Sequence, residues 1–370
     1  MCRTVVDRLV LFIVVLSLFA VGVRAQDGEE HTQDDGHNHP VAAEEGHLPD
    51  DVLRRMLMEG PRGSLAVQVV QGTAGGPPVG NRKIRVDLYH TNRPIWELNA
   101  DLDKNGLAML GDLPIAVLVR PVVWIEYDGV KYLEVGQAMD ENNPDTAMKL
   151  TVYETTREEP GWYISMRHIM VSTVPEGTVV SETLVVENPS DKTWFGGEPM
   201  RGDQGTTIRV QLPEGVEDVY LESGFHRWCC TSFEGRELAV QMPMMPGQTM
   251  FRFSYLIPTP LGEIDLRFSA FAPTKSMVLF IPDDGTVAEE KGMELQGTEN
   301  MGKQRMRNYQ ATGMEPGQEV GVVLTALTPD TTTSTQTEDS TGSAMRVVMI
   351  LGGVVVLGII GVVVMRSRGG

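Results

Sequence analysis

Alternation of apolar and polar residues dominates the chain between residues 63 and 328. In the segment "RKIRVDLYH", for example, Ile84, Val86 and Leu88 fall on one face, as a half-buried β-strand requires. In "WIEYDGVKYLEV", Asp128 and Gly129 separate two such runs and match a two-residue hairpin loop. No long segment of this part has helical periodicity. The pattern therefore predicts an all-β fold rather than alternating strands and helices.

Turn residues divide this β-rich part into modules. We expect one β-sandwich over residues 63–155 and a second over residues 162–328, in tandem. Residues 276–328 have an alternative interpretation, as a separate small sheet that would make a third module. A short helix is predicted over residues 49–60, because its apolar residues recur at helical spacing and Gly-Pro ends it.

The amino-terminal residues have the pattern of an export signal. Residues 1–25 combine a basic start, an apolar run over residues 9–23, and small or modest residues where a signal peptidase would cleave. The alternative is a retained N-terminal anchor. Residues 26–48 follow, with seven acidic residues, four histidines and no lysine or arginine. Such a composition predicts a disordered acidic leader.

The carboxyl end predicts a membrane anchor. Residues 347–365 form an uncharged apolar run that spans roughly 28 Å as a helix, about one bilayer core. We place a single transmembrane helix at residues 346–366 and a cytoplasmic tail at residues 367–370, since basic residues follow the run. A Thr/Ser-rich stalk over residues 329–345 precedes it. The protein is therefore expected in the cell membrane, with both β-modules on the periplasmic side.

Charge excludes one class of partner. The whole chain carries −19, and the signal peptide and the anchor region contribute +2 and +3 of this total, so the part between them carries −24. A surface this acidic repels nucleic acid. We therefore expect no nucleic-acid partner and contact with the lipid bilayer only through the C-terminal helix.

Three segments of the first module resemble a known domain. The stretches "GSLAVQVVQGTAGGPPVGNRKIRVDLYH", "LDKNGLAMLGDLP" and "VWIEYDGVKYL" are similar to the carboxypeptidase regulatory-like domain, a prealbumin-type β-sandwich. The resemblance covers about residues 63–152. The segment after it looks like the C-terminal part of bacterial membrane-anchored proteins that carry this domain. The resemblance implies an auxiliary, non-catalytic module, in some cases linked to adhesion or carbohydrate contact.

Two groups of residues suggest metal chemistry. Imidazole binds Zn²⁺ and Cu²⁺, and thioethers favour Cu(I). The leader contains the first group, and a Pro-rich segment of the second module contains the other. The candidate ligands are His31, His37, His39 and His47 in the leader, and Met242, Met244 and Met245 in "QMPMMPGQTM". Each group has a simpler interpretation, a solvated leader and ordinary apolar packing, so we expect no cofactor, with weakly bound Cu or Zn as the alternative.

Catalysis has little support in the sequence. Outside the leader the histidines are His90, His168 and His226, and only His226 lies near nucleophile candidates, Cys229 and Cys230. In an oxidising compartment a free catalytic thiol is unusual, and burial as small apolar residues is the simpler role for these cysteines. We find no GxSxG, HExxH or phosphate-binding loop. The sequence thus predicts no enzyme.

We expect a binding or scaffolding protein of the cell envelope. Rigid sheets position variable loops, so residues 72–81 and 196–205 are the predicted contact loops. The partner would be another envelope protein or a carbohydrate. The competing hypothesis is a periplasmic metal-handling accessory protein that uses the leader histidines and the methionine group. An enzyme of unrecognised type is the third class.

Overall fold

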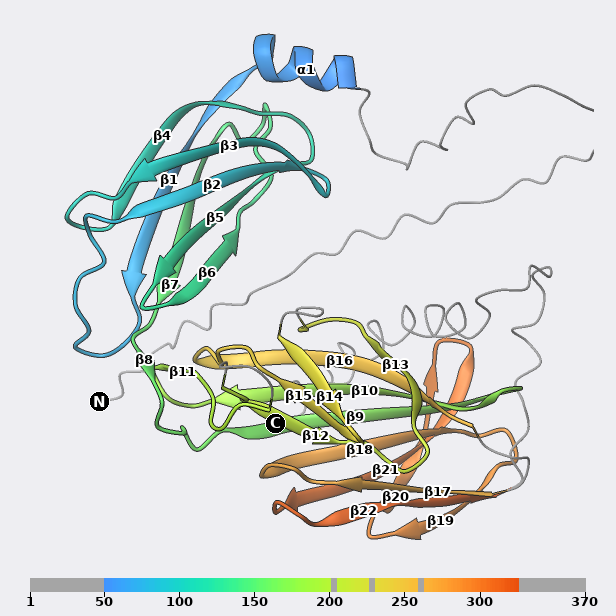
Figure 1. Ribbon diagram of the computed structural model, residues 1–370. Coiled ribbons are helices and arrows are strands. Elements are labelled where there is room, and N and C mark those ends of the chain that lie inside the picture. Colours follow the sequence, from blue (N-terminus) through green and yellow to red (C-terminus); the bar gives the residue numbers. More distant parts are fainter. Residues whose placement is uncertain (1–49, 201–204, 226–229, 259–262, 326–370) are drawn as a thin grey trace, which may run out of the picture. The chain divides into compact units, whose positions relative to one another are not determined.

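The computed structural model describes residues 50–200, 205–225, 230–258 and 263–325 (Figure 1). The predicted signal peptide, leader, stalk and transmembrane helix lie outside these residues. Among the residues described, no helix is long and apolar enough to cross a bilayer. One helix, α1 (Asp50–Glu59), occupies the segment where the sequence predicts one. All other long elements are strands.

Two sheets build the first module. A three-stranded sheet has the order β4-β1-β7, in which β7 runs parallel to β1. A four-stranded antiparallel sheet has the order β3-β2-β5-β6. The strands are β1 (Arg62–Gln71), β2 (Lys83–His90), β3 (Arg93–Asp101), β4 (Leu107–Pro114), β5 (Val119–Tyr127), β6 (Val130–Val135) and β7 (Asp145–Val152).

The core of this module lies between its two sheets. Leu65 and Val67 of β1 and Val86 and Leu88 of β2 are fully buried and belong to one apolar cluster. The alternation in each strand assigns these residues to the inner faces of a sandwich. The β5–β6 hairpin turns at Asp128 and Gly129, whose φ angles of 48° and 77° are the two positive values of a type I′ turn. This confirms the predicted hairpin.

Short segments connect the first module to the second. β8 (Thr155–Thr156) pairs in parallel with β11 (Thr193–Trp194) of the second module. The Tyr132 hydroxyl lies 2.8 Å from the Thr193 hydroxyl, and both groups are buried. Main-chain pairing and a side-chain hydrogen bond therefore both contribute to this connection.

A seven-stranded sheet forms one layer of the second module. Its order is β13-β16-β10-β9-β18-β21-β20, with β9 and β18 parallel and the other pairs antiparallel. The strands are β9 (Tyr163–Val174), β10 (Gly177–Asn188), β13 (Glu217–Leu221), β16 (Gly247–Ile257), β18 (Thr274–Pro282), β20 (Glu294–Met301) and β21 (Gln304–Met314).

Two three-stranded sheets pack on the inner face of the large sheet. Their orders are β12-β15-β14 and β17-β22-β19. Both contribute to the apolar cluster that includes β9, β10 and β16. The strands are β12 (Ile208–Gln211), β14 (Thr231–Glu234), β15 (Glu237–Val240), β17 (Glu263–Ser269), β19 (Val287–Lys291) and β22 (Glu319–Thr325). The strands of residues 274–325 therefore share the sheets and core of the second module.

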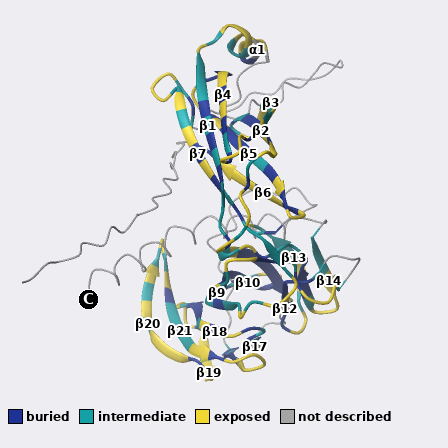
Figure 2. Ribbon diagram, turned by 90° about the vertical axis from the view of Figure 1, so that its left-hand side faces the viewer, coloured by how far each residue is buried: buried dark blue, intermediate teal, exposed yellow. Residues whose placement is uncertain are grey.

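The two faces of the large sheet differ in their surroundings. On β9, Ile169 and Val171 point to the inner core, so His168 and Met170 point to the outer face. The outer face has small apolar clusters of its own, one of which contains Phe280 and Met306. β19 and the edge strand β20 are among the most exposed strands (Figure 2).

Candidate functional site

A cleft of about 340 Å³ opens at one end of the large sheet. β9 and β18 are parallel and both begin at this end, and β21 is antiparallel to β18 and finishes here. Thr274 pairs with Ile164 on one side and with Met314 on the other, which keeps the three strand ends level. Three segments that are distant in sequence therefore meet at one site, and its volume lies in the range of small-molecule pockets.

Aromatic and apolar side chains dominate the lining of this cleft. Trp162, Tyr163 and Pro273 line it together with Met314, which is 2% exposed. Trp162 also packs against the core, and its indole Nε1 donates to Glu159 Oε1 at 2.9 Å. Core packing and this hydrogen bond thus hold the indole in place without a ligand. Fixed aromatic surfaces reduce the entropy lost on binding.

One cation borders the aromatic surface. The Lys275 ammonium lies 3.9 Å from the centroid of the Tyr163 ring, within the range of a cation–π interaction. Its N–H groups remain able to donate to a ligand beside the ring. The cleft therefore suits a ligand with an apolar face and polar edges. The adjacent aromatics in "GWYI", directly after Pro160, are the feature of the sequence that indicates this cleft.

The first predicted contact loop, residues 72–81, is partly structural. Thr73 is buried, and its hydroxyl donates to the Asp191 carbonyl at 2.6 Å and accepts from the Glu154 N–H at 2.9 Å. Its neighbour Ala74 donates its N–H to Asp191 Oδ2. The first residues of this loop therefore bind the connection to the second module.

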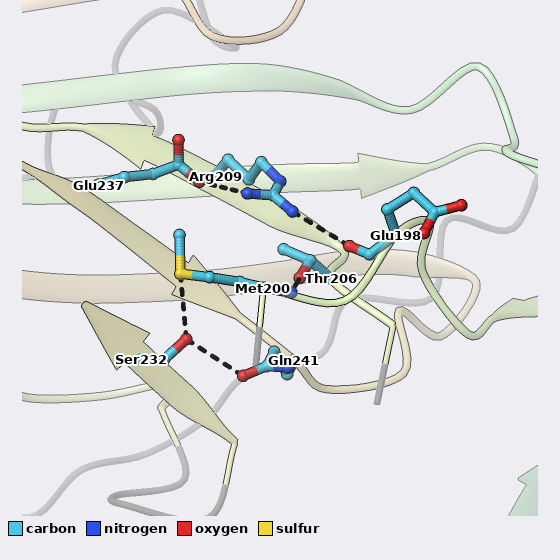
Figure 3. Close-up of polar contacts among 7 residues, drawn as sticks. All are labelled: Glu198, Met200, Thr206, Arg209, Ser232, Glu237 and Gln241. Atoms are coloured by element: carbon cyan, nitrogen blue, oxygen red, sulfur yellow. Dashed lines mark hydrogen bonds and ion pairs between the residues drawn. The ribbon is translucent and has the colours of Figure 1, made fainter. Parts of the chain in front are cut away.

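The second predicted loop, residues 196–205, is attached to the β12-β15-β14 sheet (Figure 3). Arg209 pairs with Glu237 and donates to the Glu198 carbonyl at 3.1 Å. The Met200 sulfur accepts from the Ser232 hydroxyl at 3.3 Å. Residues 201–204 lie outside the described part. The first half of the loop is thus held against the sheet.

The predicted metal ligands have different positions. His31, His37, His39 and His47 all lie outside the described residues. Met244 is 5% exposed in the inner core, Met242 packs against the same core, and Met245 is 36% exposed. Met244 thus has the packing role that we considered as the alternative. Within the described residues, no three His, Cys, Asp or Glu side chains are grouped so that they could hold a metal ion.

Some of the residues considered for catalysis lie outside the described part of the chain. His226 and Cys229 lie outside the described residues, and Cys230 is partly buried. His90 is 5% exposed at the end of β2. His168 lies on the outer face of the large sheet, where burial lowers its pKa to about 4. The prediction that this chain is no enzyme therefore stays a prediction.

Comparisons with known proteins give limited information. No family model matches the chain, and no curated protein matches it. Among solved structures, it is similar to aminopeptidase A from Legionella pneumophila at 7% identity and a TM-score of 0.29, over 46% of this chain and 22% of that one. An M1 zinc metallopeptidase from Deinococcus radiodurans matches at 9% identity and a TM-score of 0.28, over 46% and 43%. The chain thus spans less than half the length of either peptidase.

The major pilin SpaD from Corynebacterium diphtheriae covers more of the chain. It matches at 11% identity and a TM-score of 0.21, over 71% of this chain and 82% of the pilin. At these scores and identities, the matches carry no argument about function.

Proposed function

We propose that this chain is a non-catalytic, membrane-anchored protein of the cell envelope that binds a partner through the ends of its β-modules. The observation that carries this proposal is the cleft lined by Trp162, Tyr163 and Lys275. Tyr163 begins the core strand β9 and Trp162 directly precedes it, so the sheet supports both aromatic surfaces, as a binding site needs. The apolar run at residues 347–365 and the Thr/Ser-rich stalk before it support an anchored arrangement.

The lining of the cleft supports a carbohydrate or another envelope protein as the partner. A carbohydrate places C–H groups against an aromatic face and hydroxyls at its edge, and an envelope protein can present an aromatic or proline side chain in the same way. Both occupants depend on the Trp162 indole, whose removal should cost about 2 kcal/mol of binding free energy or more. Such a loss lowers the affinity roughly 30-fold.

Two binding measurements test this proposal on the full-length protein in detergent micelles. The first is co-sedimentation with purified bacterial cell-wall sacculi, and the second is photo-crosslinking in cells from a benzoyl-phenylalanine placed at Lys275. The matched control is Trp96→Ala, because Trp96 is a partly exposed tryptophan of the first module. We expect Trp162→Ala to weaken either signal, as a roughly 30-fold loss of affinity requires, and Trp96→Ala to leave it unchanged.

Equal binding by wild type, Trp162→Ala and Trp96→Ala would refute the cleft as the binding site. Anchoring is tested in the same preparation. We expect the protein to stay with membranes after a carbonate wash and its β-modules to be accessible to protease in spheroplasts. Recovery of the full-length chain from the soluble cytosolic fraction would refute the anchored part of the proposal.

A further inference from the structure

A small cavity lies on the outer face of the large sheet, away from the cleft. Its volume is about 10 Å³, close to the space that one water molecule or ion needs. Five strands contribute to its lining, which combines an imidazole, two thioethers, two hydroxyls, a guanidinium and a phenyl ring. The principal lining residues are His168, Met170, Thr183, Arg252, Phe280 and Met301.

Sheet geometry brings the imidazole and both thioethers together. His168 and Met170 are two residues apart on β9 and therefore share its outer face. Met301 ends β20, which two strands separate from β9 in the sheet. It lines the cavity because the end of the β20–β21 hairpin turns out of the plane of the neighbouring strands (Figure 1). Met306, from the same hairpin, is 1% exposed and packs with Phe280, which fixes this arrangement.

The His168 imidazole has an unused nitrogen at this cavity. Its Nδ1 atom is buried and has no hydrogen-bond partner among the described residues. A neutral imidazole has one lone pair available to a ligand. An unsatisfied buried nitrogen is costly, so a bound atom in the cavity would stabilise it.

The donor set selects the kind of atom. Two thioether sulfurs and one imidazole are soft ligands that favour Cu(I), whereas Ca²⁺ and Mg²⁺ need several oxygen ligands and structural Zn²⁺ usually four donors. Carboxylates are absent from the described lining. The positive Arg252 is paired with Glu222 at 2.8 Å and still opposes a divalent ion more than a monovalent one. We propose that His168, Met170 and Met301 bind one Cu(I) ion in this cavity.

This site is independent of the partner cleft and of the metal ligands predicted from sequence. The leader histidines and the three cysteines would bind Cu(I) on their own, so the experiment uses full-length protein in which these histidines are replaced by alanine and the cysteines by serine. The Cu(I) affinity is measured anaerobically, with ascorbate present, by competition with the chromophoric chelator bicinchoninate. The ligand variants are Met170→Leu and Met301→Leu, which keep the side-chain volume and remove the sulfur. Met109→Leu is the matched control, because Met109 is 68% exposed in the first module.

We expect each ligand variant to lower the Cu(I) affinity by at least about 10-fold. Replacing a residue that only orients a metal ligand already lowers metal affinity by about 10-fold to 100-fold. Met109→Leu should bind as the parent does. Equal affinities in all three variants would overturn the proposal.

A second measurement identifies the ligands directly and does not depend on a change in affinity. The protein is labelled at its 21 methionine methyl groups for NMR, and the signals of Met170 and Met301 are assigned from their absence in the leucine variants. One equivalent of Ag(I), an air-stable analogue of Cu(I), should shift these two signals. Shifts confined to Met242, Met244 and Met245, or shared by all methionines, would contradict this site. Unaltered circular dichroism of each leucine variant shows that it has folded.

Discussion

The most informative perturbation concerns an ion pair inside the second core. The side chains of Arg167 on β9 and Glu182 on β10 are 0% exposed, and their Nε and Oε2 atoms are 2.8 Å apart. Tyr255 donates its hydroxyl to Glu182 Oε1 at 2.8 Å, and Arg167 Nη1 donates to the Ser269 carbonyl at 2.9 Å. Burial, together with the Glu182 charge, raises the pKa of Tyr255 well above its usual value, so the phenol remains a donor.

We expect Glu182→Gln to lower the free energy of unfolding by about 3–5 kcal/mol, because it leaves the Arg167 charge buried without a counter-charge. Replacement of both charges, as Arg167→Met with Glu182→Leu, should restore part of this loss, because it removes the cost of burying ions but leaves the Tyr255 hydroxyl without its acceptor. Tyr255→Phe should cost about 1.5–3 kcal/mol, the range for a hydrogen bond to a charged group.

Urea unfolding measures these changes, and Trp194 is a suitable fluorophore because it is buried in the same core. The matched control is Glu237→Gln in the same module, where Arg209 and Glu237 form a pair whose side chains are 44% and 29% exposed. We expect the control to cost less than about 1 kcal/mol. A Glu182→Gln cost no larger than that of the control would refute the reasoning, because burial would then not determine the value of the pair.

Two further predictions concern the backbone. The Asp128 carboxylate accepts hydrogen bonds from the N–H and the hydroxyl of Thr155, which lower its pKa. These hydrogen bonds therefore stabilise the fold above pH 4, and the stabilisation is lost as the pH falls through the lowered pKa. Asp128→Asn, which retains the turn, should therefore cost about 0.5 kcal/mol at pH 7 and progressively less as the pH falls through the lowered pKa, and a cost that does not change with pH would contradict it. A Cβ at Gly321 would lie 1.8 Å from the Leu266 carbonyl oxygen, whereas one at Gly111 would have no atom within 4 Å. Gly321→Ala should lower the midpoint of thermal unfolding by several degrees more than Gly111→Ala, and similar midpoints would exclude the clash.

The sequence predicts those features that depend on neighbours along the chain. Alternation places Ile84, Val86 and Leu88 on one face, and the structure leaves none of them more than 1% exposed. Asp128 and Gly129 supply the two positive φ angles of the hairpin, because both residue types tolerate that region. These features need only the period of a strand and the chemistry of a turn.

The sites depend on long-range pairing and could not be predicted in this way. Trp162, Lys275 and Met314 meet only because three strands, distant in sequence, end at one level. The sequence shows them as one of two adjacent aromatics, a surface lysine and an ordinary methionine. Met301 reaches His168 only through the turn of a hairpin out of the sheet. No local pattern contains that information.

β9 shows why alternation was least informative in the second module. Its inner face is buried and its outer face is half-buried, and each carries a polar residue, Arg167 inward and His168 outward. A slip of one residue against β10 would exchange them and leave Glu182 in the core without its partner. Because an unpaired buried charge costs several kcal/mol, the ion pair opposes such a slip of β9. The same register places His168 and Met170 on the outer face. The geometry of the proposed copper site therefore follows from a charge pair in the core behind it.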